Sequence, residues 1–281
     1  MTPAGAFRQA LREERPLQII GVVNAYVAKM AQEAGYRALY LSGAGVANNS
    51  YALPDLGMTT LDNVLEDVRR VTAAVKLPLL VDIDTGWGHP LMIQRTVTQM
   101  ESAGVAAVHI EDQPSAKRCG HRDGKSVVPV GEMQERIAAA VEARKALIVM
   151  ARSDALAVEG FEKMVERCIA YKDAGADMLF VEALTDVQQY RRVRDAVGIP
   201  ILANMTEFGK TPLISVEEFS ASGVDMVLYP LSVTRAMNKA AWEVLHDIRS
   251  KGSQRDSVPM MQTRDELYRI LNYESYEKQL N

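Results

Sequence analysis

The sequence predicts an α/β protein in which eight parallel strands, with helices between them, close into a (β/α)8 TIM barrel. Two observations lead to this prediction. Short, near-continuously apolar runs recur eight times with amphipathic stretches between them, and polar residues follow nearly every run. The chain has 281 residues, 48% of them hydrophobic, and one barrel typically takes about 250 residues. We therefore expect one barrel domain over residues 1–281, with residues 251–281 as a C-terminal helical extension.

The eight apolar runs are the expected strands, because a run without polar alternation is typical of a strand buried on both faces of a parallel sheet. They occupy residues 19–23, 38–41, 79–83, 106–110, 146–150, 178–181, 199–203 and 226–229. Apolar residues at helical spacing precede Gly35 and Gly175, and a glycine in that place can cap the C-terminus of a helix. Strands and helices are therefore expected to alternate along the chain.

An open, doubly wound sheet would show the same alternation, and the residues after the strands distinguish the two folds. In an open sheet, function concentrates at one switch point, whereas a barrel gathers the ends of several strands around one centre. Here polar or turn-forming residues follow most of the runs, which favours the barrel. These residues are Ser42, Gly43, Asp82, Asp84, Glu111, Arg152, Asp154, Glu182, Asn204 and Pro230.

Composition excludes several classes of partner. The net charge of -4 and the dispersed basic residues give no general attraction to nucleic acid. No apolar run approaches the roughly 20 residues that cross a bilayer, so no membrane partner is expected. The two cysteines, Cys119 and Cys168, lack zinc-site spacing, which indicates a reducing compartment without structural disulfides. With no secretory or transit pattern at the N-terminus, the cytoplasm is the expected location.

Carboxylates predict a magnesium site. Asp82 and Asp84 lie two residues apart at the end of one run, so both would face the same side if the strand continued. Asp55 and Glu111 can add oxygen ligands, which Mg²⁺ prefers. The alternative is that these residues cap helices or lie in solvated loops.

Cys119 is the candidate catalytic residue. Lys117, Arg118 and His121 lie beside it and would stabilise a thiolate, so an exposed thiol there would act as a nucleophile or in proton transfer. The polar loop over residues 113–129 is long enough for a lid over a substrate. The alternatives are a small buried thiol, or a solvated surface loop.

Arg152 can clamp a carboxylate in bidentate fashion, and further polar side chains follow later strands. These are Glu182, Asn204 and Thr206. No dinucleotide-binding glycine pattern is present, so no nucleotide cofactor is expected. The remaining histidines show no ligand spacing and are assigned structural roles: His89, His109 and His246.

Beyond Lys251 the chain is polar and then carries apolar residues at helical spacing, at Leu267, Ile270 and Leu271. This pattern predicts an accessory helix. Its apolar stripe must pack against the barrel or against a neighbouring subunit.

These motifs resemble the isocitrate lyase and phosphoenolpyruvate mutase superfamily over essentially the whole chain, and above all its members that cleave 2-methylisocitrate. KRCGH, at residues 117–121, is the most specific motif; isocitrate lyases have lysine in place of Arg118 and carry large insertions that are absent here. The other matching segments are LYLSG (39–43), LPDLG (53–57), residues 81–88, HIEDQ (109–113), MARSDALAVEG (150–160), LANMTEFGKTP (202–212), residues 229–238 and residues 261–273.

The resemblance implies roles for individual residues. Mg²⁺ would be held by Asp82, with Asp84, Asp55 and Glu111 in its direct or water-bridged shell. Catalytic residues would be Cys119 as the acid and Tyr40 as a candidate base, although a barrel-interior tyrosine serves equally well in packing. The implied substrate-binding residues are Ser42, Gly43, Ala44, Lys117, Gly120, His121, Arg152, Glu182, Asn204, Thr206, Arg235, Phe180 and Leu228. Relatives often have glycine where this chain has Ala44, and isocitrate lyases tend to be bulkier at positions 180 and 228.

The implied activity is a Mg²⁺-dependent retro-Claisen cleavage of (2S,3R)-2-methylisocitrate, a tricarboxylic hydroxy acid, to pyruvate and succinate in the methylcitrate cycle of propionate catabolism. The family also implies a homotetramer that exchanges terminal helices. Alternatives within the superfamily are an isocitrate lyase, a 2,3-dimethylmalate lyase or an oxaloacetate hydrolase; a phosphonomutase would leave Cys119 without a task. An alternative from another class is a catalytically silent metabolite-binding barrel.

Overall fold

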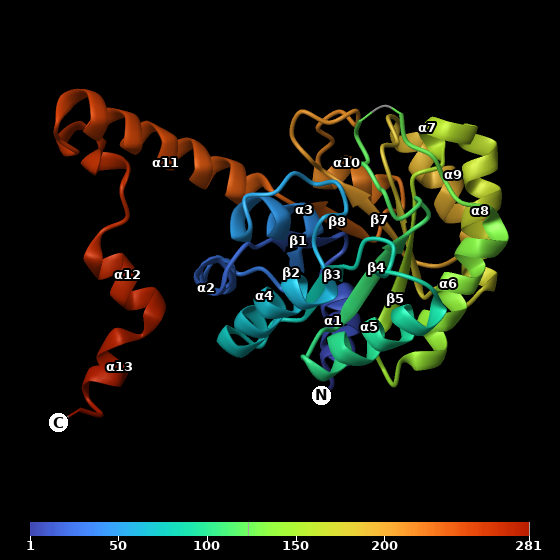
Figure 1. Cartoon of the computed structure of the whole chain (residues 1–281), viewed down its shortest axis with the longest axis horizontal. Coiled ribbons are helices and arrows are strands. Elements are labelled where there is room, and N and C mark those ends of the chain that lie inside the picture. Colours follow the sequence, from blue (N-terminus) through green and yellow to red (C-terminus); the bar gives the residue numbers. More distant parts are fainter. Residues whose placement is uncertain (123, 281) are drawn as a thin grey trace.

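A computed structural model describes residues 1–122 and 124–280 and confirms the closed (β/α)8 barrel (Figure 1). Its strands pair in parallel and in sequence order, and β8 closes on β1. They are β1 (Leu17–Gly21), β2 (Ala38–Leu41), β3 (Leu79–Asp82), β4 (Ala107–Glu111), β5 (Ile148–Ser153), β6 (Met178–Val181), β7 (Ile201–Asn204) and β8 (Met226–Tyr229).

The strand boundaries differ from the predicted ones by up to three residues. β4, β5 and β7 continue past their predicted ends to Glu111, Ser153 and Asn204, because a polar side chain can remain in a strand at the barrel mouth, whereas β1 and β3 end earlier than predicted. The strand β5 continues to Ser153, and Arg152 pairs in register with Glu111 of β4. The strand predicted over residues 79–83 does not continue to Asp84, so the condition for a shared face of Asp82 and Asp84 is not met. β3 ends at Asp82, and Asp84 has a φ of 47° in the following turn.

Helices cover the outside of the barrel and alternate with its strands (Figure 1). Local signals set many of their ends, such as the capping box of Thr60 and Asn63 at the start of α4 and the left-handed Gly198 after α9. The helices are α1 (Pro3–Glu13), α2 (Ala25–Glu33), α3 (Gly43–Gly45), η1 (Val46–Ser50), α4 (Leu61–Ala74), α5 (Pro90–Ser102), α6 (Val130–Ala143), α7 (Leu156–Glu159), α8 (Phe161–Asp173), α9 (Val187–Val197), α10 (Val216–Ala221), α11 (Ser232–Lys251), η2 (Arg255–Met260), α12 (Arg264–Leu271) and α13 (Tyr273–Glu277).

Two apolar cores position the site. One lies between strands and helices, and the other fills the barrel interior with side chains such as Leu80, Met150 and Leu202. Phe7 of α1 is fully buried in the interior core, and α1 lies at the end of the barrel where the strands begin (Figure 1). Polar chemistry is therefore concentrated at the opposite end, where the strands finish.

The helix α11 leads into an arm that extends away from the barrel, and α12 and α13 follow beyond it (Figure 1). The predicted stripe of Leu267, Ile270 and Leu271 is half-buried on α12, which packs beside α2 of its own chain. The Tyr26 hydroxyl of α2 donates to Gln262 Oε1 at 2.8 Å. Other apolar side chains of the arm, such as Trp242 and Leu245, are exposed. Within the described part of the chain, no helix is long and apolar enough to cross a membrane.

Candidate active site

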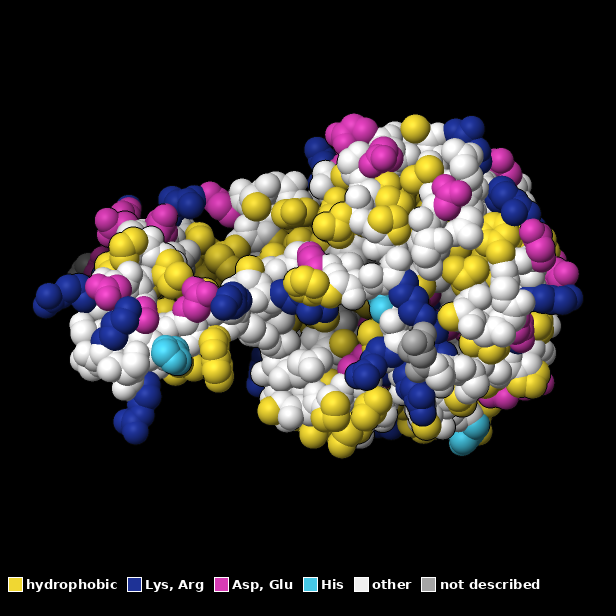
Figure 2. Space-filling model, turned by 90° about the horizontal axis from the view of Figure 1, so that it is seen from above, with side chains coloured by type: hydrophobic (Ala, Val, Ile, Leu, Met, Phe, Trp, Pro, Cys, Tyr) yellow, Lys and Arg dark blue, Asp and Glu magenta, His cyan; other side chains and the backbone are white. Residues whose placement is uncertain are grey.

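Most of the residues predicted from the sequence line one cavity at the ends of the strands; Gly43, Asp84 and Glu111 lie beside it and are not part of its lining. Its lining residues come from nearly every strand and from the loops that follow them. They are Tyr40, Ser42, Ala44, Asp55, Asp82, Lys117, Cys119, Gly120, His121, Arg152, Phe180, Glu182, Asn204, Thr206, Leu228, Pro230, Leu231 and Arg235. Figure 2 looks onto this face and shows Lys and Arg side chains gathered near its centre, with most acidic side chains at the periphery.

Asp82 anchors the acidic side of the cavity. The backbone N–H of Gly43 donates to Asp82 Oδ2 at 3.1 Å, and the N–H of Asp84 donates to Asp82 Oδ1 at 3.0 Å. A Cβ at Gly43 would lie 3.0 Å from that carboxylate, so the close approach favours glycine. Burial and the negative charge of Asp82 raise the pKa of Asp84 to about 6.

The Lys117 ammonium lies among these acids. It forms ion pairs with Asp84, at 2.9 Å, and with Asp55. Glu111 is fully buried nearby, and both of its carboxylate oxygens have no hydrogen-bond partner. Across residues 1–122 and 124–280, no three histidine, cysteine or carboxylate side chains lie at metal-binding separations. The magnesium ligand set therefore stays a prediction.

Arg152 forms the centre of the opposite wall. Its guanidinium lies 2.9 Å from Asp154 Oδ2, 3.2 Å from Glu182 Oε2 and 3.5 Å from Glu111 Oε2, and it lies over the Phe180 ring. Although burial alone would raise the pKa of Glu182, Arg152 and His121 hold it at about 2. Glu182 is thus an anion at neutral pH, and the N–H fork of Arg152 is arranged to bind carboxylates.

Cys119 is partly exposed to the cavity, and the cations that flank it in sequence are directed to carboxylates. Lys117 pairs with the acids beside β3, and His121 lies 3.0 Å from Glu182 Oε1. His121 Nδ1 accepts a hydrogen bond from the Lys210 N–H at 3.0 Å, so in neutral His121 the proton is on Nε2, directed at Glu182. The segment therefore contributes donors to the acidic wall as well as a thiol.

Gly120 has no room for a side chain. A Cβ there would lie 2.6 Å from both Arg152 Nη2 and Glu182 Cγ. The Cys119 segment is therefore in close contact with the arginine wall, as its predicted substrate-binding role requires.

Tyr40 and His109 form a buried pair on the floor of the cavity. The Tyr40 hydroxyl lies 2.9 Å from His109 Nε2, and His109 Nε2 lies 3.7 Å from Asp82 Oδ1. Burial, reinforced by the negative charge of Asp82, raises the pKa of Tyr40 well above its usual value, and burial lowers that of His109 to about 4. Both groups are neutral at pH 7, and Tyr40 is better suited to donate a hydrogen bond than to act as a base.

The other predicted residues lie around these walls. Ser42 Oγ accepts from the Gly45 N–H at 3.2 Å, and Asn204 Nδ2 donates to Glu182 Oε1 at 3.3 Å. Arg235 lies at the rim, 3.5 Å from Glu207. Phe180 and Leu228 form apolar walls, while Ala44 and Thr206 complete the lining. Of the residues assigned to the loop over 113–129, Asp123 lies outside the described residues.

Sequence reasoning missed two residues beside the site. His109 had been assigned a structural role, yet it stands two residues before Glu111 on β4, and this period of two is the signal that places both on the same face. Lys125 was not singled out, but it forms an ion pair with Asp154 directly behind Arg152. No local pattern identifies that contact, because its partner lies on another strand.

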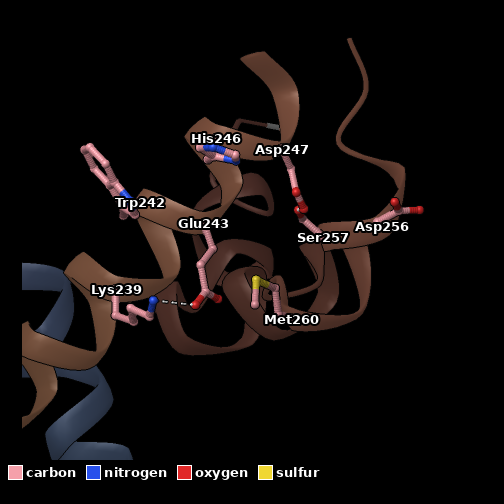
Figure 3. Close-up of a pocket in the computed structure, with 8 residues that line it drawn as sticks. All are labelled: Lys239, Trp242, Glu243, His246, Asp247, Asp256, Ser257 and Met260. Atoms are coloured by element: carbon pink, nitrogen blue, oxygen red, sulfur yellow. Dashed lines mark hydrogen bonds and ion pairs between the residues drawn. The ribbon is translucent and has the colours of Figure 1, made fainter. Parts of the chain in front are cut away.

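A second cavity lies on the arm, between α11 and η2 (Figure 3). Lys239 pairs with Glu243 there, and His246, Trp242 and Met260 complete much of its wall. It lies apart from the thiol and the arginine wall, so it is not the candidate active site.

Comparison with known proteins identifies the family to which the chain is similar. The family model for phosphoenolpyruvate phosphomutase matches residues 7–249. A 2-methylisocitrate lyase from Shewanella oneidensis is 56% identical over 277 residues, covering 98% of this chain and 95% of that protein. A crystal structure of 2,3-dimethylmalate lyase is 35% identical with a TM-score of 0.91, covering 99% and 94% of the two chains. Phosphonopyruvate hydrolase in complex with oxalate and Mg²⁺ is 29% identical with a TM-score of 0.85, covering 99% and 98%.

Proposed function

The chain belongs to the phosphoenolpyruvate phosphomutase family, and on that basis we propose that it is a carbon–carbon lyase that cleaves 2-methylisocitrate to pyruvate and succinate. The observation that carries the proposal is the meeting of the Cys119 thiol, the Arg152 guanidinium and the acidic cluster around Asp82 in one cavity. The high identity to a 2-methylisocitrate lyase over almost the whole chain supports this substrate among those of the superfamily.

The residues have distinct tasks in the cleavage. Arg152, with the backbone N–H of Ala44, binds carboxylates of the substrate and orients the bond between C2 and C3, while the Gly43 N–H holds Asp82. As that bond breaks, its electron pair passes to C3, the C2 hydroxyl loses its proton, and C2 becomes the carbonyl carbon of pyruvate. Cys119 then gives its S–H proton to C3, which completes succinate. The base that takes the hydroxyl proton is left unassigned.

Mg²⁺ is the proposed cofactor, and the residues fit it. Asp55, Asp82, Asp84 and Glu111 would supply hard oxygen ligands. The buried carboxylate oxygens of Glu111 accept no hydrogen bond, and Arg152 lies 3.5 Å from Oε2, so they are oxygen ligands of the kind that a cation satisfies. When bound, the ion would act as a Lewis acid that stabilises the charge developing on the keto acid.

Magnesium affinity is expected to fall at acid pH. Because the pKa of Asp84 is about 6, the carboxyl is protonated below that pH, and a metal ligand must be deprotonated. The apparent dissociation constant for Mg²⁺ should therefore rise between pH 7 and pH 5, by up to about tenfold per pH unit below 6. Calorimetry in two buffers of different ionisation enthalpy would detect the released proton at pH 5. An affinity that is constant from pH 7 to 5 would contradict this role of Asp84.

The apolar wall is expected to set the preference for the methylated substrate. Leu228→Phe should reduce the space beside Phe180, so the ratio of kcat/KM for 2-methylisocitrate to that for isocitrate should fall by about 10- to 200-fold. Leu213→Phe is the matched control, because Leu213 is 75% exposed outside the cavity. A ratio unchanged by Leu228→Phe would place the substrate methyl group elsewhere.

Assembly and location complete the proposal. The arm exposes Trp242 by 67%, Leu245 by 65% and Tyr276 by 67%, a surface suited to burial against a second copy in a homotetramer. Light scattering of the full chain would then give four times its 31.0 kDa. The proposed domain organisation is one barrel domain over residues 1–281, in which residues 251–281 form a helical extension. The proposed location of the enzyme is the cytoplasm.

The direct test of the substrate is keto acid release from racemic 2-methylisocitrate and from isocitrate, each with Mg²⁺ and with EDTA. We expect rapid, EDTA-sensitive release from the methylated acid and much slower release from isocitrate. Equal or reversed preference would reject the proposed substrate while leaving the lyase chemistry. Oxaloacetate and 2,3-dimethylmalate, assayed in parallel, test the two remaining alternatives.

A further inference from the structure

Lys125 is a buried cation that the proposed reaction has not used. It lies in the loop between β4 and α6, six residues after Cys119, and its side chain is only 1% exposed. Its ammonium donates to the backbone carbonyl of Gly120 and to Asp154 Oδ1, the latter at 2.8 Å. One side chain therefore joins the segment that carries the thiol to the end of β5.

Asp154 is itself held firmly. Its Oδ2 accepts from Arg152 Nε at 2.9 Å, and its backbone N–H donates to Asp112 Oδ1 at 2.8 Å. Asp112 is fully buried and accepts further hydrogen bonds from Ser153 Oγ at 2.8 Å and from the Tyr171 hydroxyl at 2.9 Å. Through Asp154, Lys125 is thus bound to a part of the barrel that several hydrogen bonds hold in place.

We propose that Lys125 is a positioning residue, which fastens the Cys119 segment through Gly120 and sets the placement of Arg152 through Asp154. The inference rests on the proposed function, because it assigns Lys125 to the same site. Its two contacts determine where the thiol and the guanidinium lie relative to each other. A proton donor and a carboxylate clamp act on one substrate only if that separation is held.

The charges around Arg152 explain why a cation is required here. Asp154, Glu111 and Glu182 all lie within 3.5 Å of the Arg152 guanidinium. Without Lys125, the buried charge of Asp154 would be compensated by Arg152 alone. The Asp154 carboxylate would then compete with the substrate for the N–H groups of Arg152. Lys125 offsets Asp154, which leaves Arg152 freer to bind carboxylates.

The close contact at Gly120 leaves little tolerance in the position of the Cys119 segment relative to Arg152. The segment passes so near Arg152 and Glu182 that not even a Cβ fits at Gly120. A shift of about 1 Å in such a site can lower the rate about 10²-fold. Loss of the Lys125 anchor at the Gly120 carbonyl should therefore affect the chemical step.

The test is Lys125→Met in the full chain, with two readouts. Amide hydrogen exchange followed by mass spectrometry should show faster exchange over residues 113–129, where the Arg118 and Arg122 amides are hydrogen-bonded within the segment. Steady-state kinetics with 2-methylisocitrate should show kcat lowered about 10²-fold and KM changed less. Lys125→Arg, which keeps the charge and the donors, should recover at least part of kcat. Lys163→Met removes the same side chain from an exposed pair with Glu166 and should change neither readout.

The outcomes separate this inference from the proposed function. Unchanged exchange over residues 113–129 in Lys125→Met would overturn it, and so would faster exchange with unchanged kcat. If Lys125→Met does not fold, Lys125→Gln keeps an N–H donor for the Gly120 carbonyl and is measured in its place. If the wild-type chain does not cleave 2-methylisocitrate, the proposed function fails, while the exchange readout still reports whether Lys125 fastens the segment.

Discussion

Replacement of Cys119 by alanine is expected to lower kcat for 2-methylisocitrate by about 10²- to 10⁴-fold, the range that a positioned proton donor contributes. The thiol lines the cavity together with Arg152 and the acids around Asp82, and no other thiol of the chain is near, since Cys168 is buried within α8. Magnesium binding should persist, because none of the proposed ligands is altered. Steady-state kinetics and calorimetry would measure the two quantities.

The matched control is Cys168→Ala. Cys168 packs against Met164 in the outer core and is not among the residues that line the cavity. Cys168→Ala should therefore lower the free energy of unfolding while leaving kcat for 2-methylisocitrate nearly unchanged. If Cys119→Ala kept the wild-type kcat, the thiol would not be the acid. If the wild-type chain itself showed no turnover, the silent metabolite-binding barrel would be the better interpretation.

Replacement of Arg152 by methionine is expected to lower both stability and activity. The side chain is 9% exposed and pairs with Asp154, Glu182 and Glu111. Its removal takes the guanidinium from all three buried carboxylates and leaves Asp154 with Lys125 and Glu182 with His121. Breaking a buried pair in this way typically costs about 3 to 5 kcal/mol. Urea unfolding would measure that loss, and kcat/KM should fall because the carboxylate clamp is gone.

Two variants control this result. Arg192→Met removes an exposed arginine paired with Glu162, and its free energy of unfolding should change by less than about 1 kcal/mol. Arg152→Lys keeps the charge but loses the planar fork, so it should restore stability more than kcat/KM. Wild-type stability of Arg152→Met would mean that the three carboxylates do not depend on this guanidinium.

Much of the fold was predictable from the sequence because local patterns determine it. The eight apolar runs indicated the eight strands, and the polar residues after them indicated the functional end of the barrel. Strand ends were less predictable. Arg152 and Asn204 are polar, yet they remain in β5 and β7 because their side chains project into the barrel mouth.

The site was predictable in its membership but not in its pairings. Sequence neighbours suggested that Lys117 and His121 stabilise the Cys119 thiolate, whereas the structure directs them to Asp84 and Glu182. Such partners come from other strands and depend on the closure of the barrel. The same reason hid the contact of Lys125 with Asp154, which spans 29 residues of sequence.

The most direct test of the central claim is to run the wild-type enzyme with 2-methylisocitrate and Mg²⁺ in D₂O and to follow the products by NMR. We expect equal amounts of pyruvate and succinate, with one deuterium on each succinate, delivered from the exchangeable Cys119 thiol. The absence of these two products, or their formation unchanged in Cys119→Ala, would contradict that claim.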